Sequence, residues 1–168
     1  FPFWYGISFQ LHGDTSKMHL TEFIEIYKPW FDSLVSKFKS DSCWIVNHIS
    51  DVKWFPNSEQ TLPLLRTLFK QHHIPNNFKG AILFDRDDLL KFSSDLISYP
   101  NNVFAKETSL YNDLEISHAE TPFIIHISGH LNIDLLSTDK QLLNKIVNEN
   151  RSDIFNLKEY RGTSLSIS

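Results

Sequence analysis

The chain has 168 residues, of which 41% are hydrophobic and 14% aromatic, and its formal net charge is −4. This composition is sufficient for a packed core and excludes a disordered chain, and no apolar run reaches the roughly 18 residues of a membrane-spanning helix. The single cysteine, Cys43, excludes an internal disulfide bond, and the negative charge disfavours direct binding to nucleic acid. At this length we expect a single domain over residues 1–168.

The first half of the chain alternates predicted strands with predicted helices. Alternating apolar side chains predict a strand over residues 3–11. From Leu20 to Phe38 the apolar residues follow helical spacing for about five turns, although Pro29 lies inside the pattern. Because the apolar stripe keeps its phase across Pro29, we expect either one kinked helix or two abutting helices.

Two more pairs of strand and helix follow in this half. Residues 43–49 predict a strand, and Ser58 is expected to cap a helix whose apolar positions lie within 62–69. Residues 81–84 predict a buried strand. Asp85 follows it directly and is expected to cap the next helix, because a carboxylate accepts hydrogen bonds from the free N–H groups of a helix N-terminus.

The second half of the chain is rich in strands. Residues 103–110 and 114–119 each predict a strand, and the short turns between strands indicate an antiparallel meander. Thr138 and Gln141 form a capping box that is expected to open the last helix. Residues 163–167 predict a short edge strand.

Residues 123–135 are predicted to form the central strand of the sheet. Apolar and polar residues alternate along this stretch, so that one face is apolar and the other largely polar, with Gly129 as a bulge. A hairpin with Ser128-Gly129 as a two-residue turn fits less well. It would pair Ile127 with His130 and so mix the two faces that the single strand keeps apart.

These elements follow the order β-α-β-α-β-α-β-β-β-α-β. Helices alternate with strands first and the strands then cluster, which indicates an α+β fold with a mixed, mostly antiparallel sheet and helices packed on it. The sequence carries no complete cofactor or metal motif, so we expect no cofactor and no metal.

Asp85 and Asp87 give the sharpest local motif. The stretch resembles the first motif of haloacid-dehalogenase-type phosphatases, in which a strand ends in Asp-x-Asp-Gly-Thr. The resemblance implies that Asp85 attacks phosphorus and Asp87 is the acid/base group of a Mg²⁺-dependent phosphohydrolase. Asp88 and Leu89 stand where Gly and Thr are expected. The helix cap is therefore the favoured interpretation, and we expect no hydrolytic activity.

Several polar residues of the predicted central strand could suggest a metal or hydrolase site: His126, Ser128, His130 and Asp134. Residues four apart on one strand are separated by about 13 Å, whereas zinc ligands lie about 2 Å from the metal. A single strand cannot bring these side chains to one ion. We therefore expect them to line a solvated or helix-covered polar face.

The chain as a whole is similar in character to immunity proteins of bacterial contact-dependent growth inhibition and related polymorphic toxin systems. It is small, acidic, aromatic-rich and poor in cysteine and glycine, with an α+β order of elements. The resemblance implies a cytoplasmic protein that binds a cognate toxin domain, commonly a basic nuclease, and blocks its activity. The acidic charge and the lack of a long apolar run predict no direct contact with nucleic acid or membrane. The alternatives are the phosphohydrolase and an accessory or structural subunit.

Acidic groups and aromatic anchors are the features expected to contact such a partner. Acids at the turns of the meander are favoured over acids at a helix start, because the latter already interact with their own helix. An aromatic side chain in a loop would serve as the anchor. The expected partner-binding residues are Asp113, Glu115, Glu120, Trp54, Tyr111, Asp87 and Asp88.

Overall fold

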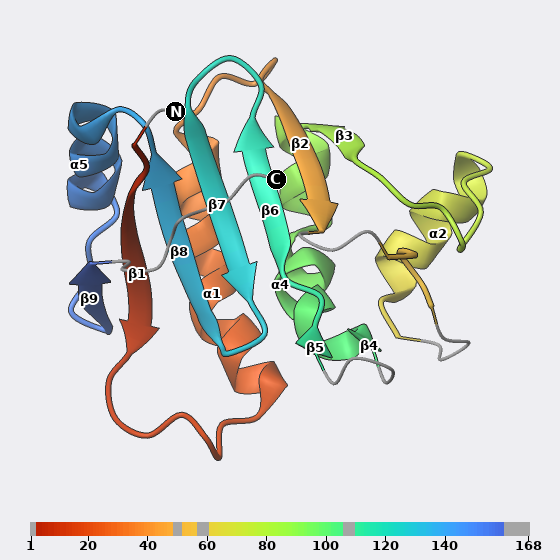
Figure 1. Cartoon of the computed structure of the whole chain (residues 1–168), viewed down its shortest axis with the longest axis horizontal. Helices are drawn as coiled ribbons and strands as arrows, with labels where there is room; N and C mark the ends of the chain where they lie inside the picture. The colour runs from red at the N-terminus through yellow and green to blue at the C-terminus, as the bar shows by residue number, and fades with distance from the viewer. Residues whose placement is uncertain (1–2, 49–51, 57–60, 106–109, 160–168) are drawn as a thin grey trace.

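A computed structural model describes residues 3–48, 52–56, 61–105 and 110–159, and Figure 1 shows the arrangement of their elements. The helices in these ranges are α1 (Leu20–Ser36), α2 (Pro63–Gln71), α3 (Arg86–Lys91), α4 (Ser93–Asn102) and α5 (Lys140–Glu149). The strands are β1 (Tyr5–Leu11), β2 (Cys43–His48), β3 (Ile82–Asp85), β4 (Phe104–Ala105), β5 (Leu110–Tyr111), β6 (Leu114–His118), β7 (Phe123–Ser128), β8 (Asn132–Ser137) and β9 (Phe155–Glu159).

Seven of the described strands form one sheet in the order β3-β2-β6-β7-β8-β1-β9, while β4 and β5 pair separately. Neighbouring strands are antiparallel throughout. Helices α1 and α4 lie behind the sheet in Figure 1. The Trp30 indole N–H donates to the Asn150 carbonyl oxygen (2.8 Å) and so ties α1 to the end of α5. The predicted α+β class with a mostly antiparallel sheet is confirmed.

The face of the sheet that meets α1 and α4, called the helix face here, carries the hydrophobic core. On β7 and β8 its residues are fully buried and stand opposite one another, Ile125 with Leu135 and Ile127 with Ile133. Burying one such side chain stabilises the folded protein by about 1.5–3 kcal/mol. The other face is called the polar face. Successive residues of a strand point to opposite faces, so the intervening polar residues of β7 and β8 lie on it.

The prediction of a single strand over residues 123–135 is wrong, because these residues form the β7–β8 hairpin. The connecting loop has three residues, 129–131, and Leu131 adopts a positive φ of 62°. A loop with an odd number of residues places Ile127 opposite Ile133. Apolar residues therefore pair with apolar residues, and polar residues with polar ones, across the hairpin. Alternation in the sequence is therefore the same for the hairpin and for one long strand.

Strand β3 differs from its prediction, and helix α1 decides between the two arrangements left open for it. Residues 81–84 were expected to form a buried strand, but β3 is an edge strand on which Leu83 is 67% exposed while Phe84 is buried. Helix α1 runs through Pro29 as one helix, which is the first of the two predicted arrangements and excludes two abutting helices. Its buried side chains on both sides of Pro29, Phe23 and Phe31 among them, pack into one core, which outweighs the hydrogen bond that proline removes.

Trp54 was expected in a loop with exposed aromatics, and that expectation is wrong. Its side chain is fully buried, with the indole N–H donating to the Gly80 carbonyl oxygen (2.8 Å). The Tyr99 hydroxyl donates to the Trp54 carbonyl oxygen (2.5 Å), and the Phe69 ring packs against the indole. Trp54 is thus an internal link between its loop and helices α2 and α4.

The helix caps follow the predictions in one case and differ in another. The Asp85 carboxylate accepts from the Asp88 backbone N–H (2.7 Å), so the predicted cap of α3 is confirmed. At α5 the cap is Asp139, which accepts from the Gln141 and Leu142 N–H groups, in place of the predicted Thr138.

Some predicted features lie outside the described residues, namely Ile49, Ser58 and the strand over 163–167. The strand predicted over 103–110 is described only at its ends, in β4 and β5, because residues 106–109 also lie outside the described ranges. Conversely, strand β9 was not predicted. It pairs with β1 at the edge of the sheet, where a mostly polar sequence gives little hydrophobic signal.

The placement of the core predicts that a buried apolar residue of the sheet tolerates a charged substitution far less than an exposed one. Ile125→Asp should lower the free energy of unfolding by about 4 kcal/mol or more, because it places an unpaired carboxylate in the core. Leu83→Asp, a matched change on an exposed strand position, should alter it by no more than about 0.5 kcal/mol. Urea unfolding followed by circular dichroism measures both. Equal losses in the two variants would contradict the assignment of faces.

Candidate functional site: a buried Asp–His–Asp network

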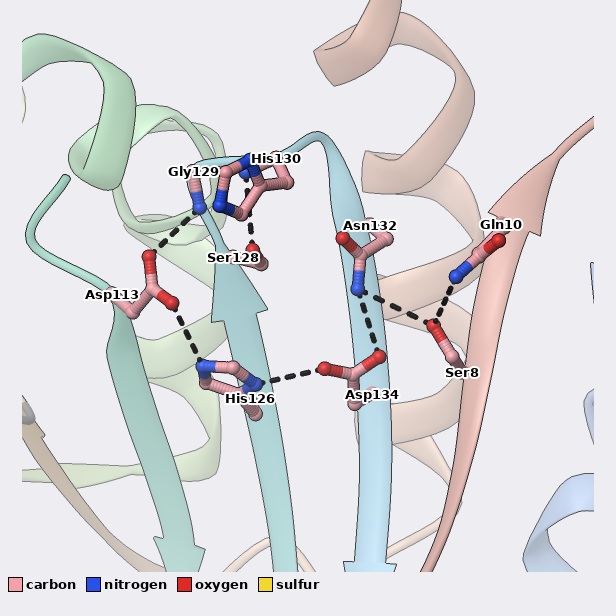
Figure 2. Close-up of polar contacts among 9 residues, drawn as sticks. All are labelled: Ser8, Gln10, Asp113, His126, Ser128, Gly129, His130, Asn132 and Asp134. Atoms are coloured by element: carbon pink, nitrogen blue, oxygen red, sulfur yellow. Dashed lines mark hydrogen bonds and ion pairs between the residues drawn. The ribbon is translucent and has the colours of Figure 1, made fainter. Parts of the chain in front are cut away.

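The polar face is organised by His126, which lies between two carboxylates (Figure 2). Its Nδ1 contacts the Asp134 carboxylate at 2.8 Å and its Nε2 contacts the Asp113 carboxylate at 3.2 Å. Asp134 is fully buried and His126 is 8% exposed, whereas the Asp113 side chain is 25% exposed. The cluster therefore runs from the interior to the surface.

The hairpin register brings these groups together. His126 on β7 stands directly opposite Asp134 on β8, so their side chains project from the same face of adjacent strands. Asp113 lies immediately before β6, and its second carboxylate oxygen accepts from the Gly129 backbone N–H (2.9 Å). Asp113 thus joins the start of β6 to the loop of the β7–β8 hairpin.

The contacts indicate that His126 is protonated at neutral pH. An ionised carboxylate only accepts hydrogen bonds, so a hydrogen on each ring nitrogen satisfies both contacts. Burial lowers the pKa of His126, but hydrogen bonds to Asp113 and Asp134 and their negative charges outweigh burial and raise the pKa to about 9. With both carboxylates ionised, the three residues carry one net negative charge.

The network continues across β8 to β1 through uncharged polar groups. The Asn132 amide donates through Nδ2 to the Asp134 carboxylate (2.8 Å) and to the Ser8 hydroxyl (3.3 Å). The Gln10 amide donates through Nε2 to the same hydroxyl (3.2 Å). Figure 2 shows these side chains in a row across three strands. Buried polar groups with such partners fix one arrangement of the sheet.

A polar cavity of about 470 Å³ adjoins the far end of this row. Gln10 and Asn132 line it, so the cavity and the buried cluster share two amide side chains. Asn156 and Lys158 of β9 form another part of its wall. The register places Gln10 opposite Asn156 and so extends the polar row to the edge strand.

The cluster is suited to holding charge in place and unsuited to accepting a proton from a substrate. A general base needs a ring nitrogen with a free lone pair, and each nitrogen of His126 faces a carboxylate. In the ranges that the structure describes, no group of three or more His, Cys, Asp or Glu side chains could hold a metal ion.

The structure separates the acids that were expected to act together. Asp113 belongs to the cluster, and Glu115 stands opposite His126 on the polar face, half-buried. Glu120 is exposed in the turn at the other end of β6. Asp87 lies at the start of α3, where its exposed carboxylate contacts the Arg86 guanidinium at 3.3 Å.

The other expected contacts lie elsewhere. Asp88 is exposed in the first turn of α3, beside Asp87. Trp54 is fully buried and so cannot serve as a surface anchor. Tyr111 belongs to β5, and its side chain lies outside the described part of the structure.

Sequence reasoning missed the direct contact between His126 and Asp134. The argument that residues on one strand are too far apart is valid only for a single strand, and the hairpin removes its premise. The available signal was the placement of polar residues at alternate positions in otherwise apolar strands. Ser8 and Gln10 on β1 repeat the pattern of Asn132 and Asp134 on β8.

Comparison with known proteins adds no family: no family model, curated protein or solved structure matches the chain. A search of the helices within the described ranges found none with the length and apolar character required to span a bilayer.

The raised pKa of His126 predicts a pH dependence of stability. A pKa near 9 in the folded protein, against about 6.5 unfolded, gives a contribution that is complete below pH 6.5 and lost as pH rises through 9. Between pH 6.5 and 9.5 the free energy of unfolding should fall by about 3 kcal/mol more in the natural protein than in His126→Gln. Urea titrations at a series of pH values measure this difference.

Two further variants make this result specific. His72→Gln replaces an exposed histidine at the end of α2 and should leave the pH dependence unchanged. Asp113→Asn removes one of the two carboxylates and should flatten part of the slope without removing the imidazole. If His126→Gln and the natural protein lose stability in parallel, His126 is not the group responsible.

Proposed function

We propose that this chain is an immunity-type inhibitor, which binds a cognate bacterial toxin domain in the cytoplasm and blocks its activity. The partner is a basic protein, most simply a nuclease domain. The observation that carries the proposal is a pair of partly exposed acids, Asp113 and Glu115, beside a buried polar network on the side of the sheet opposite α1 and α4.

The position of the acids supports recognition of a basic surface. Asp113 is partly exposed, and its orientation is fixed by His126 and by the Gly129 N–H. Glu115 lies on the same face, opposite His126. Counting these two acids with the buried Asp134 and protonated His126 gives this part of the sheet a net charge of −2. A local negative charge steers a basic partner toward it and disfavours acidic ones.

Rigidity also favours a binding role. A side chain that is already held in one geometry loses less conformational entropy when a partner binds. Asp113 is held at both carboxylate oxygens before any partner arrives. The polar face therefore offers a charged group in a fixed position on a regular sheet.

The alternative of a phosphohydrolase has weaker support. Asp85, the expected nucleophile, accepts the Asp88 N–H and so serves as the cap of α3. Its strand β3 is an antiparallel edge strand, whereas haloacid-dehalogenase-type phosphatases carry this motif on a parallel sheet. Asp87 is turned toward Arg86.

The proposal predicts which acid controls association. Glu115→Gln should slow association with the basic partner and flatten its dependence on salt, because it removes a charge from the proposed interface. Asp87→Asn, a matched change at the start of α3, should leave both unchanged. The test uses the basic toxin domain that the natural chain retains in a pull-down from its source cells, with surface plasmon resonance at two salt concentrations.

Growth provides the functional readout. Co-expression of the natural chain should relieve the growth arrest caused by that toxin domain in a bacterial host, and Asp87→Asn should relieve it equally. If Asp87→Asn associated more slowly than Glu115→Gln, the interface would lie at α3 and not at the polar face. Absence of both binding and protection would contradict the inhibitor function.

A further inference from the structure

The cavity beside the network has the acceptor groups of a cation site. Its walls include the amides of Gln10, Asn132 and Asn156, with Thr15 at one side. Lys158 is a cation among its lining residues. Among the described lining residues most are polar, and His130 is the other basic side chain. The orientation of the amides therefore decides what this part of the cavity recognises.

The buried carboxylate sets the orientation of the Asn132 amide. Asp134 can only accept hydrogen bonds when ionised, so the amide turns its NH₂ group toward Asp134 and Ser8. Figure 2 shows the Asn132 oxygen directed away from Asp134, and the Gln10 oxygen directed away from Ser8. The two amides thus donate into the network and have their carbonyl oxygens directed away from it.

The charge of the network strengthens the Asn132 oxygen as an acceptor, because Asn132 donates directly to the Asp134 carboxylate, whereas Gln10 donates to the Ser8 hydroxyl. Each amide dipole has its positive end toward the network and its negative end away from it. A hydrogen bond from an amide NH₂ group to a carboxylate polarises the amide and strengthens its carbonyl oxygen as an acceptor. The Asp113–His126–Asp134 cluster has one net negative charge, which adds a favourable field for a cation.

We propose that this cavity binds the guanidinium group of an arginine from the toxin partner, an inference that rests on the proposed function. A guanidinium group presents five N–H donors in a planar fork and needs no acceptor in return. It is also weakly hydrated for a cation, so its transfer into a partly enclosed cavity costs less than that of an ammonium group. An arginine side chain filling a pocket is a common source of binding energy in protein interfaces.

The charge of Lys158 allows a test that distinguishes a cation site from an anion site. Its exposed side chain lies on β9 opposite Ser8, at the wall of the cavity, where its charge opposes an incoming cation. Removing this charge should therefore strengthen binding of a guanidinium group. A cavity built for an anion would respond in the opposite direction.

The experiment uses the whole chain with a defined probe, N-acetyl-arginine amide, followed by NMR of the side-chain NH₂ groups. The Gln10 and Asn132 resonances should shift in a saturable manner with the arginine probe. N-acetyl-citrulline amide, its neutral analogue, and N-acetyl-glutamate amide should give no saturation. Lys158→Gln should tighten binding about fivefold, the effect of removing one like charge at contact distance in water.

Matched variants test the acceptor role of the amide. Gln10→Met keeps the approximate shape and removes the carbonyl acceptor, so it should weaken binding of the arginine probe about tenfold. Gln141→Met makes the same change at an exposed position on α5 and should have no effect. In the partner complex, Gln10→Met should speed dissociation, and the arginine probe should compete with the toxin domain.

The outcomes separate the cavity from the proposed function. No saturable shift, equal binding of citrulline, or weaker binding in Lys158→Gln would overturn the guanidinium site even if the toxin domain binds. Selective arginine binding without any toxin binding would support the cation site and overturn the proposed function. Toxin binding that the arginine probe does not compete with would place the partner's contacts elsewhere and overturn the assignment of its arginine to this cavity.

Discussion

The hydrogen-bonded ion pair between His126 and Asp134 is the constraint on which the polar face depends. A fully buried carboxylate is costly unless it is paired and hydrogen-bonded, and Asp134 obtains both from the facing imidazolium and from the Asn132 amide. The pair forms only when β7 and β8 are in their observed register. It therefore stabilises that register and, through Asp113, fixes the loop that joins the two strands.

The class of fold was predictable from the sequence, and the arrangement of its centre was not. Alternation of apolar residues identified β1 and the apolar face of β7, and helical spacing identified α1, because a core imposes those periods on the chain. The same alternation could not distinguish a hairpin from a long strand. The 129–131 loop has an odd number of residues, so apolar and polar positions continue to alternate through it without a break. Leu131 at positive φ also lacks the glycine or asparagine that marks such a position.

The candidate site was predictable only in fragments. Asp113 and Glu115 were named from their place at a turn, and both lie beside His126 in the structure. Their link to Asp134, Asn132 and Gln10 depends on strand neighbours that are distant in sequence, which local patterns do not encode. Trp54 was misplaced for a related reason. Its loop carries the composition of a surface turn, and only tertiary packing against α2 and α4 buries it.

The charge state of His126 is the property that most directly tests this account. Nitrogen-15 NMR of the imidazole at pH 7.5 distinguishes an imidazolium, in which both nitrogens are protonated, from either neutral tautomer. The account predicts that both His126 nitrogens are protonated at that pH and that the ring titrates near pH 9. A neutral ring at pH 7.5, with one nitrogen lacking hydrogen, would mean that the two carboxylates do not hold a cation and would contradict the account.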